Sequence, residues 1–534
     1  MTEYEGFFAS ATDGLRPYPY QRTLAEGDWP DLLDVPTGLG KTAGVTLAWL
    51  YRRRVLGQAD VPRRLVWCLP MRVLVEQTRR TIEGWLRALG MGQEDDAQAG
   101  VPVHILMGGE HGAREASWTL AADRDAILIG TQDMLLSRAL MRGYGMSRYQ
   151  WPVHFALLHN DAQWVFDEVQ LMGPAIATSA QLEGLRRLEA LTPSRPARSL
   201  WVSATLNSAW IDTVDLRPHR AALRTLRLSD DEKALPAVQR RLTAPKRLAP
   251  ARTRLDASAS TQSGTTAYAE ALAGEVLERR VPGTTTLAIV NTVARAQALF
   301  DALHERAPDA SVLLLHGRFR RADRKTLDER LVNEANAERI IVATQAIEAG
   351  VDLSSRVLFT ELAPWSSLVQ RFGRCNRAGE HAEAEVFWVD ADTDDKLASP
   401  YDTASLDTAR AHLEHADSAS PGQLAPTDAP APRGLALRRR DLLELFNTDP
   451  DLSGLDIDVS PWVRDLGTPQ LQVFWREFDE TPGKQAQPAH AELCVVSMGQ
   501  IREFLSGKRR AWSWDGLAGT WRDVPKENLR PGMT

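Results

Sequence analysis

The glycine-rich segment Val35-Pro36-Thr37-Gly38-Leu39-Gly40-Lys41-Thr42 constrains the fold more than any other part of this sequence. It follows a short apolar run, 32–35, and precedes a helical pattern, 42–55. A glycine-rich turn between a buried strand and a helix aims backbone N–H groups and the helix N-terminus at one point, which favours a bound phosphate. We therefore predict that residues 36–42 bind a nucleoside triphosphate, with Lys41 at the β- and γ-phosphates and the Thr42 hydroxyl on Mg²⁺. Val35 replaces the first glycine of the usual motif.

The bulk composition excludes several classes of protein. At 534 residues the chain is too long for one hydrophobic core, and we expect about three or four domains. The three cysteines lie far apart, which excludes a disulfide framework and a cysteine-based zinc site and fits a cytoplasmic location. The N-terminus has no basic leader and no apolar run reaches the length of a membrane span, so we expect no membrane partner. The net charge of −7 means that nucleic acid would have to bind at local positive patches.

Two blocks of alternating apolar runs and helical patterns indicate two parallel sheets. In the first block we expect strands at 32–35, 64–69, 103–107, 126–130, 164–166 and 200–202. An irregular, arginine-rich stretch at 206–256 and a small-polar linker at 257–264 separate it from the second block. There we expect strands at 286–290, 312–315, 340–343, 356–360 and 384–389. A Pro/Ala/Ser-rich stretch, 418–432, precedes a helix at 438–446 and short strands that carry tryptophans.

The predicted fold is therefore α/β, with two tandem RecA-like parallel-sheet lobes and a smaller C-terminal mixed domain. We expect the first lobe at 1–215, a connector and linker at 216–264, and the second lobe at 265–400. A second linker is expected at 401–435 and an accessory domain at 436–534.

An acidic pair follows the expected strand 164–166, at the carboxyl end where open parallel sheets place their chemistry. Asp167 would hold Mg²⁺ through water, and Glu168 would orient and deprotonate the water that attacks the γ-phosphate. An isolated Asp-Glu pair is more often a solvated strand end. Its place after a phosphate loop in the same block favours the catalytic interpretation.

The segment 370–377, Gln-Arg-Phe-Gly-Arg-Cys-Asn-Arg, indicates a second set of catalytic groups. Gln370, Arg374 and Arg377 fall at i, i+4 and i+7, so we expect them to share one helical face. Two guanidinium groups directed at a transferring phosphoryl group are what an arginine finger requires.

Polar residues at the ends of other expected strands are candidates for gripping a sugar–phosphate strand without reading its bases. Each of these positions, taken singly, is also compatible with an ordinary strand-to-helix loop. Gly350 and Asp352 would bind the nucleotide, as a close-approach glycine and a carboxylate for the ribose. The nucleic-acid candidates are Pro70, Arg72, Gln77, Gly109, Thr131 and Asp133 in the first block, and Asn291, Thr292, Arg318 and Thr344 in the second.

The order of these segments resembles the consecutive motifs of superfamily 2 helicases over residues 18–380. Gln21 within 18–21, and the segments 38–42, 70–77, 131–133, 167–170, 203–205, 291–292, 344–352 and 370–377, carry the resemblance. Within that superfamily the phosphate loop, 131–136, 345–352 and Asn376 are most similar to the CRISPR-associated type I helicase-nuclease. The tail segments 440–449 and 473–476 resemble its type I-U (I-G) branch.

The resemblance implies an ATP-dependent single-stranded DNA translocase and helicase that moves 3′ to 5′. It would be recruited by a CRISPR RNA-guided surveillance complex after R-loop formation. Gln21 would contact the nucleotide, and Gln170, Ser203 and Thr205 would couple the nucleotide to the strand grip. Two alternatives stay open: another superfamily 2 helicase acting on RNA or in DNA repair, and a non-motor ATP-switched clamp on nucleic acid.

The chain departs from the family pattern at two points. Gln170 stands where DEAH-like relatives have histidine, which leaves the coupling route open. No His-Asp dipeptide, the metal-binding signature of the family's nuclease domain, occurs among the 11 histidines. We therefore expect the nuclease in cis beyond the chain end or in trans on a separate chain.

The tryptophan-rich tail allows two interpretations. Lys508, Arg509 and Arg510 precede Trp512 and Trp514, with Trp521 further on. Basic residues between aromatic ones suit stacking on single-stranded bases. Tryptophans at a spacing of two are equally typical of the core face of a strand.

Overall fold

The computed structural model describes residues 2–93, 100–108, 117–188, 193–203, 207–333, 338–348, 350, 353–392, 395–425, 434–447, 449, 457–464, 470–477, 485–489, 492–506, 509–515, 518–531 and 533. The chain divides into two compact units. The first holds Met1–Ala244, Ala378–Glu380 and Ser420–Asp465, and the second holds Pro245–Arg377, His381–Ala419 and Leu466–Thr534. Among the described residues, no helix combines the length and the apolar character that a membrane span needs.

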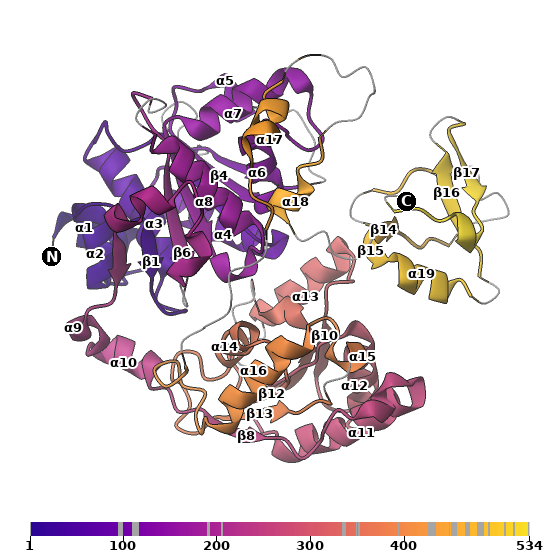
Figure 1. Cartoon of the computed structure of the whole chain (residues 1–534). Coiled ribbons are helices and arrows are strands. Elements are labelled where there is room, and N and C mark those ends of the chain that lie inside the picture. The colour runs from indigo at the N-terminus through magenta and orange to yellow at the C-terminus, as the bar shows by residue number, and fades with distance from the viewer. Residues whose placement is uncertain are drawn as a thin grey trace. The chain divides into compact units, whose positions relative to one another are not determined.

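A seven-stranded sheet in which every neighbouring pair is parallel forms the centre of the first unit (Figure 1). The predicted strands of this block are all present. The sheet also contains a short seventh strand within the stretch that we expected to be irregular. In spatial order the strands are β3 (Val103–Leu106), β4 (Ala126–Thr131), β2 (Arg64–Leu69), β5 (Ala162–Asp167), β6 (Arg198–Ser203), β1 (Leu32–Asp34) and β7 (Thr225–Arg227).

Alternate residues of these strands supply two hydrophobic cores, one on each face of the sheet. Leu65 and Trp67 of β2 pack into the first core, and Val66 and Cys68 of the same strand pack into the second. Helices cover both faces: α1 (Glu3–Ala11), α2 (Pro19–Glu26), α3 (Lys41–Leu50), α4 (Arg72–Ala88), α5 (Ser117–Leu120), α6 (Gln132–Ala139), α7 (Trp151–His159) and α8 (Ala175–Arg186), with α9 (Asp230–Lys233) and α10 (Pro236–Leu242) following the sheet.

The chain returns to the first unit after the second sheet is complete. Helices α17 (Arg439–Leu445) and α18 (Ser460–Val463) contribute Leu445, Trp462 and Val463 to the second core. The Trp462 carbonyl accepts a 2.6 Å hydrogen bond from Thr178 Oγ1, and the Val463 carbonyl accepts one from Gln132 Nε2 at 3.0 Å. These two short helices are therefore part of the first unit.

A six-stranded parallel sheet forms the centre of the second unit. The five predicted strands are present, and β8 adds a sixth at one edge. In spatial order the strands are β10 (Val312–Leu315), β11 (Arg339–Ala343), β9 (Thr285–Ile289), β12 (Val357–Glu361), β13 (Glu385–Val389) and β8 (Arg247–Pro250). The helices are α11 (Gln262–Arg279), α12 (Val293–Arg306), α13 (Arg321–Asn333), α14 (Trp365–Phe372), α15 (Asp395–Ala398) and α16 (Thr403–Glu414).

The expectation of a linker at 257–264 is wrong. Residues 257–260 form a 3₁₀ turn, and α11 begins at Gln262. The reason is local capping: the Thr261 side chain accepts a hydrogen bond from the Gly264 N–H, which satisfies one of the free donors of the first helical turn. Small polar residues therefore start a helix here instead of separating two domains.

The C-terminal residues form the predicted small mixed structure. Two antiparallel pairs, β14 (Gln470–Val473) with β15 (Cys494–Ser497) and β16 (Trp512–Asp515) with β17 (Thr520–Asp523), accompany α19 (Met498–Phe504). Its core is small and centres on Leu471, Met498, Leu505 and Leu529.

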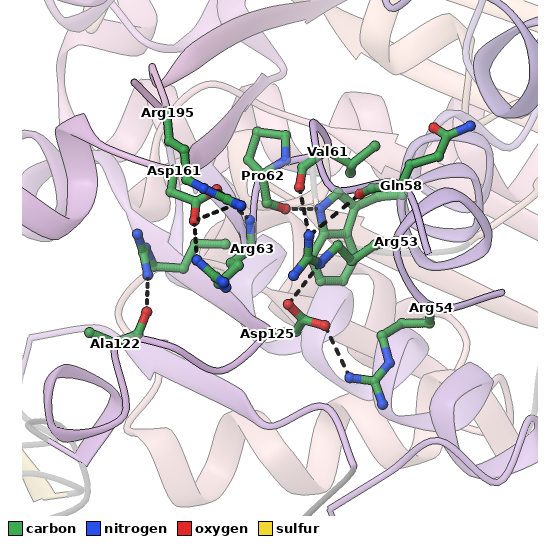
Figure 2. A network of polar contacts seen from close by, with 12 residues as sticks. Arg53, Arg54, Gln58, Val61, Pro62, Arg63, Ala122, Asp125, Asp161 and Arg195 are labelled. Carbon is green, nitrogen blue, oxygen red and sulfur yellow. Dashed lines mark hydrogen bonds and ion pairs between the residues drawn. The ribbon is translucent and has the colours of Figure 1, made fainter. Parts of the chain in front are cut away.

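Part of the arginine content of the first unit is structural. Figure 2 shows a polar network in which Asp125 accepts hydrogen bonds from Arg53 and Arg54, and Asp161 pairs with Arg63 and Arg195. Both aspartates directly precede a strand of the sheet, β4 and β5 respectively. The network therefore lies at the amino ends of the strands, whereas the predicted site residues of this unit lie at the carboxyl ends.

Candidate nucleotide site and strand-gripping loops

The phosphate loop lies between β1 and α3, as predicted. Gly38 and Gly40 adopt φ angles of 84° and 73°, in the left-handed region where a side chain is strained. Lys41 begins the helix, and its Nζ donates a 3.0 Å hydrogen bond to the Val35 carbonyl. The ammonium is thus held within the loop, and Lys41 is only 7% exposed.

Gln21 forms a direct hydrogen bond with the phosphate loop. Its Nε2 donates to the Gly40 carbonyl at 2.8 Å, and its Oε1 accepts from the Tyr18 N–H at 2.8 Å. A Cβ at residue 40 would lie 2.9 Å from Gln21 Nε2 and would displace that amide, and the positive φ also favours glycine there. Tyr20 adds a hydrogen bond from its hydroxyl to the Leu39 carbonyl at 2.7 Å. Sequence reasoning missed Tyr20, since an aromatic beside a predicted glutamine carries no signal of its own.

The acidic pair lies at the end of β5, one strand away from the phosphate loop. The strand register pairs Asp34 with Ser203 and Asp167 with Val202, so the ends of β1, β6 and β5 are adjacent. Burial, and secondly the charge of Glu168, raise the pKa of Asp167 to about 7, while Lys41 lowers it. Glu168 adopts a φ of 51°, a strained conformation for a side-chain-bearing residue that is frequent at functional sites.

The donor set fits Mg²⁺. The Asp167 carboxylate and the Thr42 hydroxyl are hard oxygen ligands, and Mg²⁺ is commonly held by one or two such groups together with water and substrate phosphates. No group of three or more His, Cys, Asp or Glu side chains suited to a metal occurs within the described residues. A bound Mg²⁺ would supply charge neutralisation of the phosphates.

A chain of hydrogen bonds connects the acidic pair to the next strand. Gln170 Nε2 donates to Glu168 Oε2 at 2.5 Å, and the Ser203 hydroxyl donates to Gln170 Oε1 at 2.9 Å. Glutamine can serve both partners because its amide offers a donor and an acceptor. The position that departs from the usual histidine therefore joins the ends of β5 and β6. Thr205 lies outside the described residues.

The remaining candidates of the first unit lie at the carboxyl ends of β2, β3 and β4. Arg72 begins α4 and is exposed, with its guanidinium near Gly108, and Pro70 and Gln77 flank it at half-buried and exposed positions. Thr131 ends β4 and is 7% exposed. Burial raises the pKa of Asp133, although the charges of Arg464 and Arg72 lower it in part. The Oδ1 atom of Asp133 is buried and has no hydrogen-bond partner among the described residues. Gly109 lies outside the described residues.

In the second unit the candidate residues follow β9, β10 and β11. Thr292 caps α12 by accepting from the Arg295 N–H, and Thr344 is buried directly after β11. Arg318 is half-buried after β10, and Gly350 adopts a φ of 74°. Asp352 lies outside the described residues.

Sequence reasoning missed the buried hub of this unit, Arg371. Its guanidinium is fully buried and donates to Glu348 Oε1 at 2.8 Å, to Asn291 Oδ1 at 2.9 Å and to the Thr360 hydroxyl at 2.9 Å. The Asn291 N–H in turn donates to Glu361, which also pairs with Arg295. Arg371 thus connects the segments that follow β9 and β11 to the last residues of β12, and it holds the Asn291 side chain within the network.

The predicted helical face of residues 370–377 is wrong. Helix α14 ends at Phe372, and only Gln370 of the three residues is helical. The chain leaves the helix because residues 374–376 bridge to Ser355: the Ser355 N–H donates to the Arg374 carbonyl, and the Asn376 N–H donates to the Ser355 carbonyl. Arg374 is buried with its Nη2 on the Glu348 carbonyl at 2.6 Å, and Arg377 is half-buried with its backbone N–H on Ser354 Oγ.

Comparison with known proteins agrees with this geometry. A family model of DEAD/DEAH box helicases matches residues 23–214, and a model of the C-terminal part of CRISPR-associated nuclease/helicase Cas3 matches residues 282–380. The CRISPR-associated helicase Cas3 of Thermoproteus tenax is 26% identical over 73% of this chain and 60% of its own length. A putative CRISPR-associated nuclease/helicase Cas3 of Myxococcus xanthus is 29% identical over 95% of this chain and 64% of its own length.

Solved structures share the fold. The crystal structure of T. fusca Cas3-AMPPNP covers 92% of this chain and 65% of its own at a TM-score of 0.62 and 17% identity. The DUF1998 helicase MrfA bound to DNA and AMPPNP covers 78% of this chain and 54% of its own at a TM-score of 0.52 and 17% identity.

These matches confirm the predicted fold of two RecA-like lobes and the predicted resemblance to helicases and to CRISPR-associated helicase-nucleases. The finer resemblance to the type I-U branch stays a prediction. The chain spans less than two thirds of the length of the two Cas3 relatives described above.

Proposed function

We propose that this chain is an ATP-dependent translocase and helicase on single-stranded DNA. The observation that carries the proposal is the set of groups at the ends of adjacent strands: the phosphate loop after β1, the acidic pair after β5 and Ser203 at the end of β6. The groups proposed to pair with the phosphate charge, to activate water and to couple the nucleotide to the strand grip thus lie at the same end of one sheet. Phosphoryl transfer requires such groups because it depends on positioning and electrostatic stabilisation.

We assign each residue of the proposed site a role in ATP hydrolysis. Lys41 leaves the Val35 carbonyl for the phosphates, and Thr42 and Asp167 hold Mg²⁺. Glu168 orients the attacking water and takes its proton, which requires the ionised carboxylate that Gln170 stabilises by donating to it. Arg374 and Arg377 supply positive charge to the transferring phosphoryl group, and Gln370 contributes a neutral amide beside them. Gly350 and Asp352 approach the nucleotide.

The strand-gripping residues are proposed to contact phosphates only. In the first unit these are Pro70, Arg72, Gln77, Gly109, Thr131 and Asp133. In the second they are Thr292, Arg318 and Thr344, with Asn291 positioned by Arg371. Backbone contacts of this kind carry no base sequence and allow stepwise movement along any strand.

The similarity to Cas3 proteins supports a role in CRISPR type I interference. We infer that an RNA-guided surveillance complex recruits the chain to DNA in the cytoplasm and that it moves 3′ to 5′. We also infer a nuclease in cis or in trans, because several relatives are named nuclease/helicase. A pure preparation of these residues should leave single-stranded DNA uncut when Mg²⁺, Mn²⁺, Co²⁺ or Ni²⁺ is supplied. Metal-dependent cutting that survives Lys41→Ala would reveal a nuclease site in this chain.

The decisive experiment is the ATPase rate with single-stranded DNA, single-stranded RNA or neither, together with strand displacement. Stimulation by DNA alone, with displacement, supports the proposal. Stimulation by RNA indicates an RNA helicase, because phosphate contacts do not distinguish the sugar. Hydrolysis without displacement indicates an ATP-switched clamp. Lys41→Ala should abolish hydrolysis, and Glu168→Gln should retain ATP binding and lose turnover. Wild-type turnover of Glu168→Gln would exclude Glu168 as the base.

A further inference from the structure

The second unit contains a groove that is lined mainly by the C-terminal structure, together with Arg318 and Arg320 from the segment after β10. The groove has a volume of about 770 Å³ and a largely apolar lining. Protein interiors contain few voids larger than a water molecule, whereas sites for organic ligands span roughly 300–1,000 Å³. A space of this size, beside a core of four buried residues, is large enough for an organic ligand.

Aromatic side chains line the groove, and they divide into two kinds. Trp521 is 6% exposed, packs edge-on against Trp514 at 5.4 Å and belongs to the local core, as the strand-core interpretation predicts. Trp475, two residues after the end of β14, is 76% exposed. Phe504, at the end of α19, is 42% exposed. These two rings are available to a ligand.

The lining is also basic. Arg320, Arg476 and Arg510 are each paired with a carboxylate. Arg318 and Arg509 have no ion pair within the described part of the chain. The Arg509 guanidinium lies 4.2 Å from the centre of the Phe504 ring, so a flat cation already stacks on one of the available aromatics.

We propose that this groove binds single-stranded nucleic acid, with a base stacked on Trp475 and phosphates facing Arg318 and Arg509. Unpaired arginines beside exposed aromatic rings are the elements with which proteins hold single strands without sequence preference. An apolar peptide would gain nothing from the two unpaired charges. Arg318 also follows β10, in a loop whose sequence predicts a phosphate contact, so the groove continues from a strand-gripping loop.

The proposal deepens the nucleic-acid binding of the proposed function and rests on it, but it requires neither ATP nor turnover. The test is therefore anisotropy of labelled oligothymidylate with the full chain and without nucleotide. Trp475→Ala should weaken binding roughly tenfold, within the range of one lost base stack, and Trp475→Phe should restore most of it. Arg509→Ala should lower the slope of log affinity against log salt by about 0.7.

Arg502→Ala is the matched control, since Arg502 is an exposed arginine of α19 that does not line the groove. It should bind as the wild type does. Photo-crosslinking with 5-iodouracil strands should map to Trp475, which a purely structural role would not produce. Unchanged affinity in both Trp475→Ala and Arg509→Ala overturns the proposal and points to a protein ligand. Absence of ATP hydrolysis with intact groove binding would instead refute the proposed function alone.

Discussion

Removing Arg371 should destabilise the second unit more than any exposed substitution in it. The guanidinium is fully buried and donates to Glu348, Thr360, Asn291, Tyr401 and the Glu361 carbonyl. Burial lowers the pKa of Arg371, but the charges of Glu348, Tyr401 and Glu361 and the hydrogen bond to Glu348 together outweigh burial, so the pKa is raised overall and the group stays charged. Arg371→Met keeps an unbranched apolar stem and deletes every donor.

The magnitude follows from what the substitution leaves behind. Glu348 is 4% exposed and would keep a buried charge without its ion-pair partner. Breaking a buried pair in this way costs about 3–5 kcal/mol. The whole unit has roughly 5–15 kcal/mol of stability, so the loss removes between about a fifth and all of it. For a unit of this size the loss corresponds to a decrease in melting temperature of about 6–20 °C.

Differential scanning calorimetry of the full chain measures this decrease as a shift of one transition. The double variant Arg371→Met/Glu348→Leu should recover about half of the loss, because no isolated charge stays buried. Arg247→Ala is the control: its side chain is 76% exposed and 3.8 Å from Glu385, and it should cost less than about 1 kcal/mol.

Two results would refute this reasoning. A decrease below about 2 °C for Arg371→Met would mean that water or a rearranged partner satisfies Glu348. A double variant less stable than the single one would mean that the uncharged hydrogen bonds to Asn291 and Thr360, and not the ion pair, dominate the loss.

Three further predictions concern the proposed chemistry. Arg374→Ala and Arg377→Ala should each lower ATP turnover by about 10³-fold with little change in ATP affinity; normal turnover in both, measured by phosphate release, contradicts the arginine-finger role. Arg318→Ala should weaken single-strand binding equally for all base sequences and lower the salt slope by about 0.7; a loss confined to particular sequences in anisotropy titrations contradicts a backbone-only grip. Mg²⁺ binding should displace the proton that the raised pKa of Asp167, about 7, retains below neutrality. Apparent Mg²⁺ affinity should therefore fall about tenfold per pH unit below pH 7 and be level above pH 8, and a flat profile between pH 6 and 8 would argue against Asp167 as a ligand.

The raised pKa of Asp167 also makes the stability of the folded chain depend on pH. A carboxyl whose folded pKa is raised from 3.8 to about 7 favours the protonated folded state. Its contribution is fully present below pH 3.8 and is lost as the pH rises through 7. Nucleotide-free protein should thus lose stability, not gain it, over that interval on account of this group.

The central strands were predictable from sequence because both faces of a parallel sheet are buried, which produces continuous apolar runs. The edge strands β7 and β8 lacked this signal. In β7 the exposure pattern is exposed, half-buried, exposed, and β8 carries Arg247 at one end and Pro250 at the other. Proline, which cannot donate to a ladder, is tolerated at such an edge. These strands exist through pairing with a neighbour, which no local pattern encodes.

The groups of the proposed nucleotide site could be placed at strand ends from sequence, because each belongs to a short contiguous segment. The hub of the second unit could not be placed in this way. Arg371 is one of three arginines within seven residues, and its burial depends on Glu348 and Asn291, which lie 23 and 80 residues away in the chain. Spacing alone cannot say which of several arginines a distant carboxylate will select.

The prediction of one helical face at 370–377 was wrong for the same reason, because a contact with a distant residue decides the local structure. The same contact explains the conformation of Asn376. The spacing of Gln370, Arg374 and Arg377 would share a face only if the helix continued, but the bridge to Ser355 ends it and forces Asn376 to a φ of 44°. Glycine and asparagine are the residues that best tolerate this region, which accounts for an asparagine at residue 376. Asparagine then adds what glycine lacks: its Nδ2 donates to the Pro245 and His381 carbonyls, and its Oδ1 accepts from the His381 N–H. The loop that carries Arg377 is therefore fixed by a side chain, so the orientation of the second arginine depends on residue 376 and not on a helix.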